Sequence, residues 1–84
     1  MKKTIMVEVD AAQLFADESK DWEFCKEFAT YSHYEACEFI LHIGPKDYSD
    51  HRIKEMEEFG CSAGLINAYK AARESWATNV LFYA

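Results

Sequence analysis

The sequence has few of the residues that interrupt regular structure and few positive charges. Of its 84 residues, only three are Gly and one is Pro, so long unstructured stretches are not expected. Nine Lys and Arg residues stand against 15 Asp and Glu, which gives a net charge of −6. Such a chain repels nucleic acid and anionic membranes, so direct binding to either is not expected. A basic protein surface would be attracted instead.

Cysteine is also scarce, and its three copies follow no pattern. Cys25, Cys37 and Cys61 are odd in number and lack paired spacing, which predicts free thiols in a reducing compartment instead of a disulfide framework. No apolar run approaches the roughly 20 residues of a membrane span. Glu8 and Asp10 interrupt the first apolar segment before the core of a signal peptide could form. We therefore expect a cytoplasmic protein.

What the sequence does contain is enough apolar material for one core. Half of the residues are hydrophobic and 15% are aromatic. A chain of this length is long enough for one domain and too short for two. We expect a single domain over residues 1–84.

Alternating apolar residues predict two strands, and a short apolar run predicts a third. They cover about residues 3–9, residues 37–43, which Gly44 and Pro45 close, and residues 80–83. A helix over residues 35–43 remains a competing interpretation, because short apolar runs fit either period.

Helical spacing predicts the segments between these strands. Asp10 and Gln13 have the form of a capping box. After it, a helix capped by Ser19 is expected to end near residues 31–33. Its predicted inner face consists of Trp22, Cys25, Phe28 and Ala29.

Two further helices are predicted after Pro45. Asp47 or Ser49 would cap the first, which runs to Phe59 and ends at Gly60 as a left-handed residue. Ser62 would cap the second. The clearest amphipathic stripe in the chain lies on this last helix and consists of Leu65, Tyr69, Ala72 and Trp76.

The predicted order is β-α-β-α-α-β, which indicates an α+β fold. We expect a small sheet of about three strands with the helices packed on one face. Two consecutive helices return the chain to the end it left, so the last two strands should be antiparallel if they are adjacent.

Two patterns resemble catalytic or metal sites, but neither has the context that the chemistry needs. Residues 60–64 match G-x-S-x-G, yet a helix precedes Ser62 and no His follows it, so a helix cap is the better interpretation. His33, His42 and His51 are each nine residues apart, which is not the short spacing of zinc ligands. We therefore expect no enzyme activity, no cofactor and no metal.

Acidic clusters are the functional feature that remains. Acids also stabilise helix starts and are common on solvated faces. A purely structural role for these acids therefore competes with a role in binding a partner. The candidate residues of the two clusters are Asp17, Glu18, Asp21 and Glu23, and Asp47, Asp50, Glu55, Glu57 and Glu58. A second set of candidates, on the outer side of the sheet or on a helix rim, consists of Met6, Tyr48, Tyr83 and Trp22.

The whole-chain pattern of small size, strong acidity, unpaired cysteines and short β and α elements resembles the small acidic inhibitors that phages make against host defences. These include anti-CRISPR and antirestriction proteins. The resemblance rests on no shared motif. It implies a non-catalytic, phage- or mobile-element-encoded inhibitor of a host nucleic-acid-handling protein, acting through an acidic surface.

Some members of that class mimic DNA, with carboxylates in place of phosphates. The lysines and arginine between the acids make ordinary surface inhibition an equal alternative. A small homodimeric ligand-binding or regulatory module is the second alternative, since an exposed sheet face or edge would support self-association.

Overall fold

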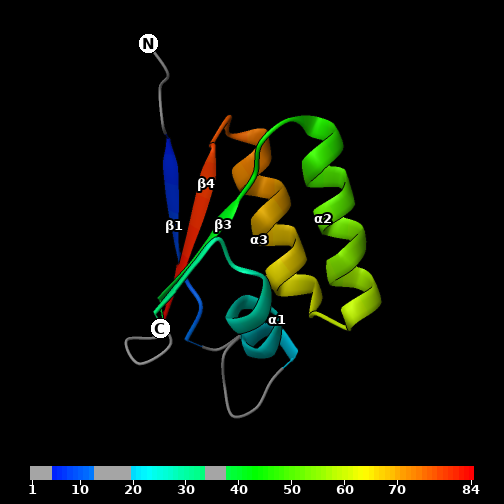
Figure 1. The fold of residues 1–84 in the computed structure, drawn as a ribbon. Helices are drawn as coiled ribbons and strands as arrows, with labels where there is room; N and C mark the ends of the chain where they lie inside the picture. Colours follow the sequence, from blue (N-terminus) through cyan, green and yellow to red (C-terminus); the bar gives the residue numbers. More distant parts are fainter. Residues whose placement is uncertain (1–4, 13–19, 34–37) are drawn as a thin grey trace.

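The computed structural model describes residues 5–12, 20–33 and 38–84, and over these residues it contains four strands and three helices (Figure 1). The strands are β1 (Met6–Asp10), β2 (Tyr31–His33), β3 (Glu38–His42) and β4 (Asn79–Tyr83). The helices are α1 (Lys20–Phe28), α2 (Lys46–Phe59) and α3 (Ala63–Glu74). The α+β class is therefore confirmed. Among the described residues, no helix has the length and apolar character needed to cross a membrane.

The strands form one mixed sheet in the order β1-β4-β3-β2. β1 pairs with β4 in parallel, whereas β4 pairs with β3, and β3 with β2, in antiparallel fashion. The predicted antiparallel relation of the last two long strands is confirmed. Figure 1 shows the helices on one side of this sheet.

β2 corrects the prediction of about three strands. Its residues were expected at the end of the first helix, but α1 ends at Phe28, and Tyr31 pairs with Ile40 of β3. A three-residue strand is too short to show a period in the sequence. The strand assignment for residues 38–42 is confirmed over the competing helix.

The core lies between the sheet and the helices. Alternate residues of β3 and β4 are buried, namely Phe39, Leu41, Val80 and Phe82. Opposite them lie Phe24 and Cys25 of α1, Ile53 and Met56 of α2, and Leu65, Tyr69 and Ala72 of α3. The hydroxyl of Tyr69 donates a hydrogen bond of 2.8 Å to the carbonyl of His42, which ties α3 to β3.

The buried face of α1 differs from the predicted stripe. Phe24 and Asp21 are buried beside Cys25, whereas Trp22, Phe28 and Ala29 are only partly buried. The predicted inner face is rotated by about one residue from the observed one. In a short helix with many aromatic residues, the sequence allows more than one choice of apolar face.

The helix boundaries confirm some of the predicted caps. Gly60 ends α2 with φ 97°, and the Ser62 hydroxyl accepts the Leu65 N–H at 3.3 Å at the start of α3. The caps expected at Asp47 or Ser49 are wrong, because α2 begins earlier, after Pro45, with no side-chain cap. Predicted features at Gln13, Ser19 and Cys37 lie outside the described residues.

Trp76 is the largest departure from the predicted core. α3 ends at Glu74, so the stripe from Leu65 to Ala72 is buried but Trp76 lies beyond the helix. Its side chain is 85% exposed and its φ is 64°. The spacing of apolar residues cannot show where a helix stops, and the stripe was extended one turn too far.

Candidate binding surface

The side of the sheet that faces away from the helices is the candidate surface. Successive side chains of a strand point to opposite faces, so the residues between the buried ones face away from the core. We call these residues the open face: Met6, Glu8, Asp10, Tyr31, His33, Glu38, Ile40, His42, Asn79, Leu81 and Tyr83.

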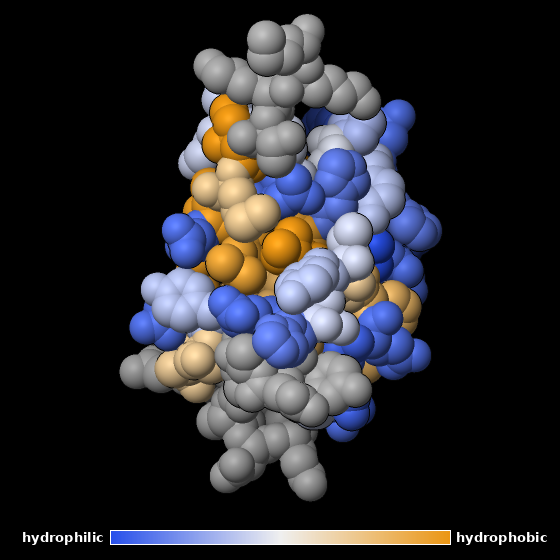
Figure 2. Space-filling model, turned by 60° about the vertical axis from the view of Figure 1, so that its left-hand side comes forward, coloured by the Kyte–Doolittle hydropathy of each residue, from blue (hydrophilic) through white to orange (hydrophobic). Residues whose placement is uncertain are grey.

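The register places the half-buried Leu81 and Ile40, on the two central strands, in the middle of the open face. Leu81 is paired with Ile40, which in turn is paired with Tyr31. Met6 is 43% exposed and Tyr31 is 52% exposed. Figure 2 shows apolar side chains gathered on this side of the molecule with hydrophilic ones around them. Exposed apolar patches of this kind mark interaction sites in soluble proteins.

The fixed charges of the open face are all negative. Its strands carry Glu8, Asp10 and Glu38, and none of the described strand residues is Lys or Arg. Glu8 and Asp10 are exposed, and the Glu38 carboxylate lies 3.7 Å from His33 Nδ1. The open face therefore combines an apolar middle with carboxylates near it.

The first predicted acidic cluster does not form a common surface in the described residues. Asp17 and Glu18 lie outside them. Asp21 is buried, and its carboxylate accepts the Ser62 N–H at 2.7 Å and the Ser62 hydroxyl. This corrects its place among the surface candidates. Glu23 is exposed and forms a weak ion pair with Lys20 at 3.7 Å.

The second predicted cluster lies on α2 and is partly neutralised. Asp50 bonds to Lys46 at 2.7 Å and to Arg73, and Glu55 lies 3.1 Å from Arg52. Asp47, Glu57 and Glu58 are exposed and have no ion-pair partner among the described residues. Only these three remain free to meet a partner's cations.

Sequence reasoning missed the acids of the open face. Glu8 and Asp10 lie two residues apart on β1, so their alternation with apolar residues already places them on one face. Glu38 is 28 residues beyond Asp10, and only the β1-β4-β3 register places it on the same surface. Met6 and Tyr83, proposed as outer-face residues, do lie there and are 43% and 38% exposed.

The two cysteines in the described part of the chain, Cys25 and Cys61, have the environments of structural groups. Burial raises the pKa of the Cys25 thiol far above its ordinary value, with smaller contributions from Cys61 and Asp21. Burial, followed by the charge of Asp21, raises the pKa of Cys61 to about 12. Thiols in this state stay protonated near neutral pH and are poor nucleophiles.

The G-x-S-x-G serine is also occupied by structural bonds. Ser62 donates to Asp21, accepts from Leu65, and stands at a helix start instead of at the end of a strand. Within the described part of the chain, no group of three or more His, Cys, Asp or Glu side chains could hold a metal ion.

Comparison with known proteins finds no matching family model, no matching curated protein and no matching solved structure. The function has to be inferred from the surfaces of the chain itself.

Proposed function

We propose that this chain is a non-catalytic binding domain whose open face takes a basic surface of a partner protein. The observation that carries the proposal is the open face itself, where Ile40, Leu81 and Tyr31 lie in register beside carboxylates and without a Lys or Arg on the described strands. Protein interfaces commonly have an apolar, aromatic middle and a polar rim.

Charge decides which partner fits. The net charge of −6 attracts a basic surface at long range and speeds its association. A second copy of the chain is a poorer partner, because face-to-face pairing would place Glu8, Asp10 and Glu38 of both copies in one poorly hydrated interface. Like charges in such an interface cost several kcal/mol.

The proposed biological role is inhibition of a nucleic-acid-handling protein, such as a host defence nuclease. Proteins that bind DNA or RNA carry basic grooves, and a bound acidic domain would occupy such a groove. The apolar middle of the open face favours ordinary surface inhibition over close mimicry of DNA. The phosphate backbone of DNA has no apolar patch that such a middle could imitate.

The test is capture from nuclease-treated bacterial lysate with tagged wild-type protein and two variants of equal charge change. Glu8→Lys alters the open face, and Glu57→Lys alters α2. We expect capture of a nucleic-acid-binding protein that high salt releases, that Glu8→Lys abolishes and that Glu57→Lys retains. The captured protein should lose its affinity for DNA or RNA when the wild-type chain is added.

Equal capture by both variants would contradict the open face as the binding surface. Loss of capture with Glu57→Lys alone would indicate that the partner binds α2 instead. Absence of capture, together with a dimer on a sizing column, would favour the homodimeric module.

A further inference from the structure

The ends of α2 and α3 have the same backbone geometry but different residues at the key position. At the end of α2, Cys61 N–H donates to Met56 O at 3.0 Å and Gly60 N–H to Glu57 O at 3.3 Å. At the end of α3, Ala77 N–H donates to Ala72 O at 3.2 Å and Trp76 N–H to Arg73 O at 3.1 Å. Both are Schellman motifs, in which the left-handed residue is normally Gly.

Folding does not explain the choice of Trp at this position. A bulky side chain in the left-handed region is a steric outlier, and Trp76 adopts φ 64°. The side chain is also 85% exposed, so it contributes little apolar burial. Trp76 combines a strained backbone with an exposed indole, and neither favours folding. Such a residue is a candidate for a functional role.

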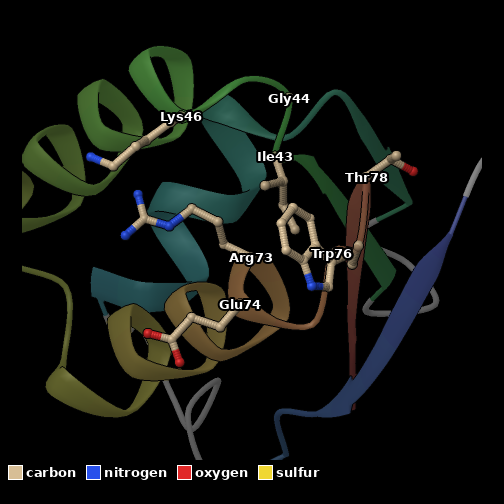
Figure 3. Close-up of a pocket in the computed structure, with 8 residues that line it drawn as sticks. Ile43, Gly44, Lys46, Arg73, Glu74, Trp76 and Thr78 are labelled. Atoms are coloured by element: carbon tan, nitrogen blue, oxygen red, sulfur yellow. The ribbon is translucent and has the colours of Figure 1, made fainter.

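Trp76 stands beside a cavity of about 600 Å³ at the end of the sheet (Figure 3). This volume lies in the range of small-molecule sites. The residues that line it are Ile43, Gly44, Lys46, Arg73, Glu74, Trp76, Ala77 and Thr78. Figure 3 shows the Trp76 ring next to Ile43 and the Lys46, Arg73 and Glu74 side chains on the other side, with the charged ends of all three directed away from the indole. The cavity therefore has an aromatic, apolar side and a charged side that carries two cations and one carboxylate.

The cations keep unused donors. The Asp50 carboxylate accepts hydrogen bonds from Lys46 Nζ and Arg73 Nη1, and Ser49 Oγ accepts from the same Nη1 at 3.3 Å. The other guanidinium nitrogens of Arg73 have no hydrogen bond to the described residues. Asp50 thus holds the two cations together while leaving donors for a further anion.

We propose that this cavity binds a small planar aromatic carboxylate, with its ring stacked on the Trp76 indole and its carboxylate bound by Arg73 and Lys46. The eight lining residues contain two cations and one carboxylate, so the lining is more positive than the chain as a whole, whose net charge is −6. A planar ring matches the exposed indole, and a carboxylate matches the fork of a guanidinium. This site is separate from the open face and does not depend on the function proposed for it.

The test uses 2-naphthoate as the probe and 2-naphthamide as its neutral match, followed by amide and indole N–H chemical shifts and by calorimetry. We expect saturable shifts at the Trp76 indole and at the amides of Gly44 and Thr78. The amide probe should bind about tenfold more weakly, which corresponds to the loss of one charged contact.

The decisive variant is Trp76→Gly, which suits the backbone and so should fold at least as well as wild type. It should weaken 2-naphthoate binding at least about tenfold without lowering the melting temperature. Tyr83→Ala, which removes an exposed aromatic from the open face, is the matched control and should bind as wild type does. Unchanged binding by Trp76→Gly, equal binding of both probes, or no saturable shift at millimolar 2-naphthoate would each overturn the proposal.

Discussion

The two faces of the sheet are built from alternate residues of the same strands, yet they follow different rules. On the covered face, Phe39, Val80 and Phe82 are fully buried. They belong to one core cluster with apolar side chains of the helices. The open face carries Ile40 and Leu81, which point away from the helices and lie beside carboxylates. Adjacent residues of one strand therefore differ in their part in the core and in the proposed binding surface, and substitutions at them should have separate effects.

The largest expected effect tests this separation on β4. Phe82→Ala removes a fully buried ring and should lower the free energy of unfolding by about 3–5 kcal/mol. Leu81→Ala, one residue away on the open face, should cost about 1 kcal/mol. Urea denaturation measures both. Similar losses for the two variants would mean that the open face is part of the folding core.

The next largest effect concerns the polar bond that holds the covering helices together. Asp21 is 3% exposed and accepts two hydrogen bonds from Ser62, which lies 41 residues away. Asp21→Ala leaves the Ser62 donors without this acceptor and should cost about 1–3 kcal/mol. Glu23→Ala, on the exposed side of α1, is the control and should change stability by less than about 0.5 kcal/mol. An unchanged midpoint for Asp21→Ala would mean that water replaces the carboxylate.

These residues also show how far the sequence could predict the fold. Ser62 and Gly60 were predictable because caps depend on local backbone chemistry. β3 was predictable from the alternation of apolar residues, and β4 from a short apolar run. The burial of Asp21 was not predictable, since its position in the first turn of a helix already explains an acid. Its bond to Ser62 depends on the packing of α1 against the turn between α2 and α3.

The candidate surface was harder to predict from the sequence than the fold. The sequence suggested Met6 and Tyr83 as outer-face residues, but the lateral alignment of Leu81, Ile40 and Tyr31 exists only in the paired sheet. β2 has three residues and no readable period. Trp76 was assigned to the core because its spacing continues that of Ala72, and the spacing contains no information about the end of α3.

A third prediction extends the contrast from the sheet to the two helix ends. Gly60 suits its left-handed backbone, so Gly60→Ala should lower stability by about 1 kcal/mol. Trp76→Gly should raise stability by up to about 1 kcal/mol, because it removes the same kind of strain and little buried surface. Thermal unfolding of the two variants tests the pair. A destabilised Trp76→Gly protein would show that the indole supports the fold, and the argument for a binding role would fail.

The smallest expected effect concerns charge on the helix side, where Asp50 has two cationic partners, Lys46 and Arg73, whereas the described strands of the open face carry no Lys or Arg. Hydrogen bonds from Lys46 and then from Arg73 hold the pKa of Asp50 below its ordinary value of 3.8. A lowered pKa in the folded state means that the carboxylate stabilises the fold above the unfolded pKa and loses that contribution as the pH falls through the folded pKa. The contribution is small because the group is exposed. A carbon-detected titration of Asp50 should show its midpoint rise toward 3.8 in Lys46→Gln and in Arg73→Gln. A midpoint that stays where it is in both variants would show that neither cation holds the Asp50 carboxylate, and the contrast in charge pairing between the two sides of the molecule would lose its main example.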